Sequence, residues 1–395
     1  MTSPSWVALT LSMVLVALTG CGRSSQQSIR DSAAGTPQIE LILTGLENPR
    51  GVAIGPNGEL FVAEAGTGRY SADPASGDGK FTRFTDINDD GDFNDTGEAE
   101  RWFSHLPSYN ALKVYDTGRD EVGGPVDVLL HRDGRIFLSV DDGGFGEMAL
   151  HEISPAKSVG RSLAGRNNMN GITFNLGQDK IFAVESGFNT LIEIPLEGEL
   201  REIVILPPLD SGQQAVPAGL TLDPRTGDVL VALFSGRVQD NETGETIPFV
   251  DGDAKIVRVD TETGQLTDEI TDLTTAVDVA MDEAGNIIVV ELAATSTDLL
   301  PSTFDLFDPH APLVHGGYLR FSGRVTLFPS KGGPPRVLAT GLDAPTNVTI
   351  GPDGSLYIST GQGTPGRLIP GPDGPTMIVG EVIRITNYLS EIENP

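Results

Sequence analysis

One short pattern recurs six times along this chain and limits the folds that it can adopt. Each copy is a β-branched run, a turn that contains glycine, and a second β-branched run, which is typical of a β-hairpin. The first copy, TGLENPRGVAIGPNGELFVAEAG, covers residues 44–66, and the last, TGLDAPTNVTIGPDGSLYISTGQG, covers residues 340–363. Four weaker copies begin at Val122, Asn167, Ala215 and Thr274. Beyond the N-terminal segment no stretch has sustained helical periodicity, so the sequence predicts an all-β protein.

The copies extend into larger units. A third β run follows several of them, at 190–194, 254–260 and 380–386, and a fourth is visible at 202–206 and 336–340. Four short antiparallel strands per repeat, arranged about a ring, describe a six-bladed β-propeller. The segment 39–44 is similar to the fourth strand at 336–342, and the last repeat ends after its third strand. We therefore expect the N-terminal strand to complete the last blade, which closes the ring without an open edge.

The N-terminus has the features of an export signal. Residues 7–18 form an apolar run without charge, too short to span a bilayer and typical of the central region of a signal peptide, although residues 1–6 carry no Lys or Arg. The run ends in Leu-Thr-Gly-Cys, which resembles a bacterial lipobox, so Cys21 is the expected lipidation site and first mature residue. Because Cys21 is the single cysteine of the chain, the mature protein forms no internal disulfide.

These features divide the chain into a signal peptide at 1–20, a flexible tether at 21–37, a propeller at 38–389 and a tail at 390–395. The expected blade insertions are at about 67–120 and about 294–325. The expected product is an exported, monomeric cell-envelope lipoprotein, periplasmic or attached to the outer membrane, which contacts the membrane through its lipid alone. A formal net charge of −29 excludes nucleic acid as a partner, because so negative a surface repels phosphates.

Aligning the six copies predicts a polar channel mouth. The first strand of each blade lines a propeller's channel, and the loop before this strand meets the loop after the second strand on one face. Polar residues occupy these places in most copies, and the expected ligand-binding set is Arg50, Glu64, Asp127, Asp141, Asn170, Glu185, Asp278, Glu291 and Asn347. Such a ring of acids and amides suits a divalent ion with oxygen ligands. Alternatively, these side chains cap strand ends and are solvated by channel water.

An acidic loop in the first insertion matches the start of an EF-hand calcium loop. Oxygen-bearing side chains stand at positions 1, 3 and 5, and glycine stands at position 6. Position 12 is Gly97, and the acid expected there follows one residue later. The predicted calcium ligands are Asp86, Asn88, Asp90, Asp92, Asn94 and Glu98. The alternative is a solvated acidic turn.

The usual signatures of catalysis are missing from the sequence. It contains neither HxH nor HExxH, no GxSxG, no phosphate-binding loop, and no GxGxxG after a strand. Its five histidines are His105, His131, His151, His310 and His315. No histidine falls in a column of the repeat alignment that faces the mouth.

The first repeat, the TDINDDGDFND insertion and the closing GLDAPTNVTIGPDGSLYISTG resemble the bacterial ScyD/ScyE family of six-bladed propellers, which is related to the NHL and TolB-like groups. The resemblance covers residues 38–388 and implies an exported propeller, encoded in some members with scytonemin pigment biosynthesis, without a reaction to transfer. Function therefore has to be argued from the site.

Three functions remain open on the sequence alone. The first is a non-enzymatic propeller, stabilised by calcium, that binds a small molecule or protein at its mouth. The second is a metal-dependent hydrolase similar to the gluconolactonases, with Glu64, Asn170 and Asp278 as metal ligands and Glu185 or Glu291 nearby. The third is a quinone-dependent sugar dehydrogenase, which needs a histidine at the channel.

Overall fold

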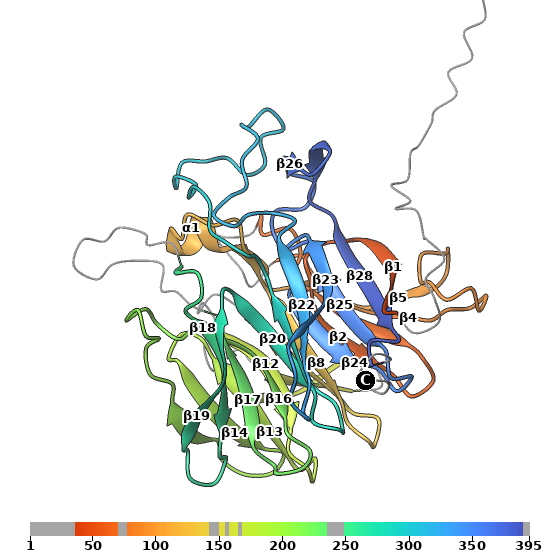
Figure 1. Ribbon diagram of the computed structural model, residues 1–395. Coiled ribbons are helices and arrows are strands. Elements are labelled where there is room, and N and C mark those ends of the chain that lie inside the picture. Colours follow the sequence, from red (N-terminus) through yellow and green to blue (C-terminus); the bar gives the residue numbers. More distant parts are fainter. Residues whose placement is uncertain are drawn as a thin grey trace, which may run out of the picture.

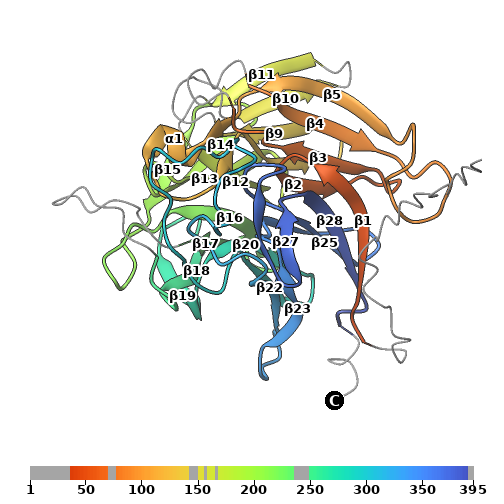
Figure 2. The same ribbon diagram turned by 90° about the horizontal axis from the view of Figure 1, so that it is seen from above.

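The computed structural model of the protein describes residues 36–69, 77–141, 150–154, 158–164, 168–234 and 249–389. Six four-stranded antiparallel sheets surround a central axis (Figure 1). The view from above shows them as blades of one ring (Figure 2). The predicted all-β, six-bladed propeller is confirmed. Cys21 lies outside the described residues, as do the signal peptide and most of the tether.

The two inner strands of each blade correspond to the predicted hairpins. The innermost strands are β2 (Pro49–Ile54), β8 (Pro125–Leu130), β12 (Met169–Phe174), β16 (Pro217–Leu222), β20 (Ala276–Met281) and β24 (Asn347–Ile350). The second strands are β3 (Leu60–Glu64), β9 (Ile136–Val140), β13 (Lys180–Glu185), β17 (Val229–Leu233), β21 (Ile287–Glu291) and β25 (Leu356–Thr360). Each second strand is buried along almost its whole length, because a neighbouring blade covers each of its faces.

The outer strands complete the blades. The third strands are β4 (Gly79–Phe84), β10 (Leu150–Ser154), β14 (Thr190–Pro195), β18 (Ala254–Val259), β22 (Gly323–Phe328) and β28 (Gly380–Thr386). The outermost strands are β5 (Ala99–Leu106), β11 (Ser158–Ala164), β15 (Arg201–Ile205), β19 (Leu266–Leu273), β23 (Arg336–Leu342) and β1 (Gln38–Leu46). The hydrophobic core lies between blades. For example, Phe61 of the first blade belongs to the same cluster as Val128 and Leu138 of the second.

The two ends of the folded chain close the ring. Strand β1 pairs antiparallel with β28, from Gln38 opposite Thr386 to Leu46 opposite Gly380. Figure 2 shows the red β1 beside the blue β28. Ile42 of β1 is 1% exposed and packs in the last interblade cluster. The predicted closure by the N-terminal strand is confirmed.

Three segments outside the blades lie over one end of the ring, and we call them the cap: residues 107–124, 294–322 and 362–379 (Figure 1). The first contains the strands β6 (Tyr109–Asn110) and β7 (Val122–Gly123) with the five-residue helix α1 (Ala111–Tyr115) between them, and the third contains the hairpin of β26 (Leu368–Gly371) and β27 (Gly374–Met377). The segment 67–120 is therefore not one insertion, because it includes the blade strands β4 and β5. None of the helices in the described ranges is long and apolar enough to cross a membrane.

The cap segments hold one another in place. Leu112 of α1 forms a small apolar cluster with Leu300 and Leu306 of the second segment. The carboxylate of Asp120 joins the first and third segments, because it accepts a 2.6 Å charged hydrogen bond from Arg367 Nε and a 2.8 Å bond from Thr364 Oγ1. Charged hydrogen bonds in a buried site are strong and directional, so the cap has a defined shape.

Candidate functional site

A cavity of about 360 Å³ lies between the cap and the central channel. Its floor is formed by consecutive blades, because residues at the start of their first strands face it. These residues are Arg50, Asn170, Ala218 and Val277, which are the second residues of β2, β12, β16 and β20, and Thr346, which directly precedes β24. The cap supplies the residues from Tyr109 to Gly123 that line the opposite side. The cavity is therefore a product of the ring and the cap together.

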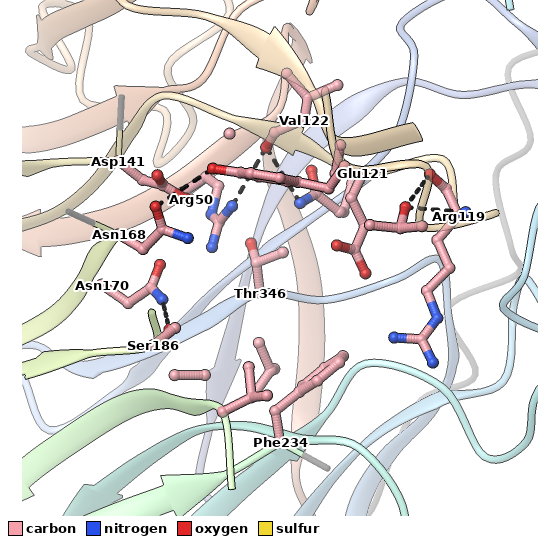
Figure 3. A pocket seen from close by; sticks show the side chains of 18 of the residues that line it. Arg50, Arg119, Glu121, Val122, Asp141, Asn168, Asn170, Ser186, Phe234 and Thr346 are labelled. Carbon is pink, nitrogen blue, oxygen red and sulfur yellow. Dashed lines mark hydrogen bonds between the residues drawn. The ribbon is translucent and has the colours of Figure 1, made fainter. Parts of the chain in front are cut away.

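One end of the cavity carries a hydrogen-bonded polar group (Figure 3). Tyr109 donates a 2.6 Å hydrogen bond to Asp141 Oδ2, and Asn170 donates to Ser186. Arg50 Nη1 donates to the carbonyl of Val122 at 3.2 Å. Burial and the neighbouring Asp141 carboxylate raise the pKa of Tyr109 well above its usual value, so this phenol stays protonated and remains a donor.

The other end carries Arg119, whose guanidinium points toward the cavity in Figure 3. The side chain is 2% exposed, and its Cζ lies 5.3 Å from the ring centroids of both Phe249 and Tyr318. Its Nε and Nη2 have no hydrogen-bond partner among the described residues. Burial lowers the pKa of Arg119, and burial raises the pKa of the neighbouring Glu121 carboxyl.

An apolar wall faces these charged groups. It consists of Val216, Ala218, Phe234, Val277 and Leu292. Figure 3 shows Phe234 on the side of the cavity opposite Glu121. Such a mainly apolar enclosure with a few convergent polar groups is typical of small-molecule sites.

Three residues of the predicted mouth set line this cavity: Arg50, Asp141 and Asn170. Asp127, Asp278 and Asn347 stand one position further along the first strands, so their side chains alternate away from the cavity floor. Each of these side chains accepts a hydrogen bond from a backbone N–H group on the first strand of the next blade. The donors are Ile172 for Asp127, Val348 for Asp278 and Val52 for Asn347.

These bonds lock neighbouring blades together inside the channel. Burial raises the pKa of Asp127 to about 6, against the opposing effect of its two backbone N–H bonds. Burial also raises the pKa of Asp278 well above its usual range, and the Asp127 carboxylate adds to this shift. The channel therefore holds two carboxyl groups that resist ionisation.

The predicted glutamates at the ends of the second strands bond within their own blades. Glu64 accepts a hydrogen bond from Glu47 N at 2.9 Å. Glu185 accepts one from Thr190 Oγ1 at 2.7 Å, and Glu291 pairs with Arg324. None of the three lines the cavity. The hydrolase set of Glu64, Asn170 and Asp278 is not brought to one place.

In the acidic loop, residues 86–98, the carboxylates accept hydrogen bonds from the loop's own backbone N–H groups. Gly91 has φ +90°, and the Asp86 carboxylate accepts from the backbone N–H groups of Asp90 and Gly91. The carboxylate of Glu98, 2% exposed, accepts from Ile87 N and Asp95 N.

The same loop is docked on the closing strand. Phe93 N donates to Ile42 O, and Thr44 N donates to Asn94 Oδ1. The Asn94 oxygen is therefore already engaged by strand β1. In the described ranges no three His, Cys, Asp or Glu side chains form a group that could hold a metal ion. The calcium ligand set stays a prediction.

The histidines lie away from the cavity. His131 Nε2 bonds to the carbonyl of Gln178 at 2.8 Å. His315 lies in the cap, where its Nδ1 accepts from Arg320 N. No histidine lines the cavity as the structure describes it, so the dehydrogenase reading gains no support from this site.

The cap residues Tyr109, Arg119 and Glu121 were not predicted, because they lie outside the repeated positions. The only sequence signal for them was the charged run Arg119-Asp120-Glu121 beside Gly123-Gly124. Phe234, directly after β17, lies within the fourth copy but was not predicted because only polar side chains were selected.

Comparison with known proteins supports the fold. No family model matches the sequence, and no curated protein matches it. A Trichoderma reesei protein of carbohydrate-active enzyme family AA12 superposes with a TM-score of 0.52 at 12% identity, over 90% of this chain and 96% of that one. Virginiamycin B lyase from Staphylococcus aureus gives 0.46 at 14% identity, over 89% and 99% of the chains. A gluconolactonase from Xanthomonas campestris gives 0.39 at 16% identity, over 61% and 68%. At 12% identity, the similarity to the Trichoderma reesei protein shows the propeller fold alone.

Proposed function

We propose that this protein binds a small molecule in the cavity between the channel mouth and the cap. The observation that carries the proposal is the composition of the wall, in which residues on or directly beside strands of all six blades, together with the cap, enclose one space of about 360 Å³. This volume falls within the range of small-molecule sites. The cap covers the mouth, which favours a small ligand over a docked protein surface.

Filling the cavity should abolish binding. Ala218 lies on the floor at the start of β16, so Ala218→Phe places a ring inside the space. In a thermal-shift screen of small organic compounds, we expect compounds that stabilise the wild type to lose at least about tenfold in affinity for this variant. The matched control is Ala99→Phe, on the exposed face of the outermost strand β5, which should retain wild-type shifts. Equal stabilisation of Ala218→Phe and wild type would place the binding site elsewhere.

We also propose that the protein is an exported lipoprotein similar to the ScyD/ScyE family. The supports are the apolar run at 7–18, the lipobox-like tetrapeptide ending at Cys21 and the sequence resemblance. Expressed in a bacterial host, the full chain should fractionate with membranes and incorporate labelled palmitate. Cys21→Ser should be unlabelled and leave the membrane fraction. Label retained by Cys21→Ser would refute lipidation at this residue.

Calcium binding by the loop 86–98 is a separate proposal. It rests on the spacing of oxygen side chains and on the positive φ of Gly91 at the sixth position. Millimolar calcium should raise the melting temperature by about 3 °C, because a ligand of the folded state shifts the unfolding equilibrium. Asp86→Asn should lose this shift. Asp89→Asn removes the same charge at position 4, which supplies no ligand, and should keep it. If calcium raises the melting temperature of both variants as much as that of the wild type, Asp86 does not bind the ion and the loop is only a solvated turn.

The hydrolase and dehydrogenase alternatives are not proposed. The first requires Glu64, Asn170 and Asp278 around one ion, and of these Asn170 alone lines the cavity. The second requires a histidine at the channel.

A further inference from the structure

We infer that the ligand of the cavity is a small organic monocarboxylate with an apolar body, and that Arg119 is the residue that binds its carboxylate. This inference rests on the proposed function and names the class of molecule that the cavity takes. Arg119 lines the cavity from the cap, and two of its three guanidinium nitrogens lack a partner among the described residues. A buried guanidinium without an acceptor is costly, so its retention calls for an anion supplied from elsewhere.

The other buried arginines of the cap show what a structural arginine looks like in this protein. Arg320 is 4% exposed and pairs with both carboxylate oxygens of Asp343 at 2.6 Å. Arg367 is 5% exposed and donates to Asp120, to Val314 O at 2.8 Å and to His315 O at 3.0 Å. Arg367 thus joins all three cap segments, and Arg320 joins the cap to Asp343, which lies between β23 and β24. Arg119 is more deeply buried than either, yet its Nε and Nη2 have no hydrogen-bond partner within the described part of the chain.

The position of Arg119 is fixed in advance of binding. Its guanidinium lies over two aromatic rings, Phe249 and Tyr318, which stack on each other with centroids 5.7 Å apart. Gly317 packs so closely that a Cβ at that position would lie 2.7 Å from Arg119 Cγ. A planar cation held between fixed neighbours loses little conformational entropy when a carboxylate binds to it.

The charge of the cavity limits the anion to a single negative charge. Arg50 and Arg119 supply two positive charges, and Asp141, the acceptor of the Tyr109 hydrogen bond, offsets one of them. Burial raises the pKa of Glu121, which favours its neutral form. A phosphate carrying about two negative charges exceeds the remaining positive charge and is repelled by Asp141, whereas a monocarboxylate balances that charge. The apolar wall around Phe234 then accommodates the uncharged body of the molecule.

The test uses benzoate and its neutral isostere benzamide as probes, with inorganic phosphate as a third. Calorimetric titration of the wild-type protein should detect benzoate binding in the millimolar range or tighter, at least about tenfold tighter than benzamide. Arg119→Met keeps the apolar stem and removes the charge, so it should reduce benzoate affinity at least about tenfold and leave benzamide binding nearly unchanged.

A second readout separates a binding residue from a structural one without any ligand. Because Arg119 Nε and Nη2 have no hydrogen-bond partner among the described residues, and the methionine stem can keep the contact with the aromatic rings, the melting temperature of ligand-free Arg119→Met should equal or exceed that of the wild type. Arg367→Met is the matched control and should melt several degrees lower, because it leaves Asp120 buried without its cation.

Each outcome decides one part of the account. Benzamide binding as tightly as benzoate, with both lost in Ala218→Phe, would overturn the anionic class and leave the proposed cavity function standing. Benzoate binding that survives Ala218→Phe would refute the cavity itself. No benzoate binding at 10 mM, phosphate binding tighter than benzoate, or a ligand-free Arg119→Met that melts as low as Arg367→Met would each overturn the inference.

Discussion

Replacing Gly219 with alanine is expected to destabilise the whole ring by about 4 kcal/mol. Gly219 lies on β16 where the first strands of two blades approach each other. A Cβ there would lie 2.8 Å from Cα of Asp278 on β20, and closer still to its carboxylate. Moving Asp278 also breaks its 2.8 Å bonds from Val348 N and Asn347 Nδ2, so one methyl group disturbs three blades. Overpacking and lost buried hydrogen bonds both contribute to this figure.

Urea unfolding followed by circular dichroism measures the effect. The control is Gly177→Ala, in an exposed turn where the nearest atom is the flexible end of Asp179, and it should change the free energy of unfolding by less than about 0.5 kcal/mol. A Gly219→Ala variant as stable as the control would show that the first strands are not packed as tightly as the structure has them.

As the pH rises from 4 to 8, the free energy of unfolding of an Asp127→Asn variant should increase by about 2 kcal/mol relative to that of the wild type. The folded-state pKa of Asp127 is raised to about 6, whereas an aspartate in the unfolded chain titrates near 4. The folded protein therefore binds the proton more tightly than the unfolded chain does. The stability that this group contributes is complete below the unfolded pKa and is lost as the pH rises from about 4 to about 6. Asparagine resembles the protonated acid and has no such loss.

The measured quantity is the difference in unfolding free energy between variant and wild type at each pH. In this difference the groups that titrate alike in both proteins cancel, so it reports Asp127 together with the effect of its charge on the neighbouring Asp278. If instead the wild type gains stability relative to Asp127→Asn as the pH rises, then the backbone N–H bonds lower the pKa of this carboxyl by more than burial raises it.

The six-bladed architecture could be predicted from the sequence because the same short pattern of strand and turn residues recurs in each blade. Turn glycines such as Gly58 and Gly354 have φ of +86° and +75°, and each connects two β-branched runs. Closure by β1 was also predictable, since 39–44 is similar to the outermost strand of another blade. The helix α1 was not, because a single turn capped by Asn110 leaves too little periodicity to detect.

The site was predictable only in part, for two physical reasons. Side chains alternate along a strand, so a shift of one residue separates the cavity floor at Arg50 and Asn170 from the channel positions of Asp127 and Asp278. The alignment combined these two columns into one set. The cap residue Arg119 was missed because its position follows from packing between segments distant in the chain, for which no local pattern exists.

The most direct test of the account is a crystal structure of the protein soaked with 4-iodobenzoate, with anomalous data collected on the iodine. The account predicts one iodine peak within the cavity, against the apolar wall that contains Phe234, and carboxylate density within hydrogen-bond distance of Arg119 Nε and Nη2. An iodine peak outside the cavity, or an iodine atom beside Arg119 with the carboxylate directed elsewhere, would contradict it.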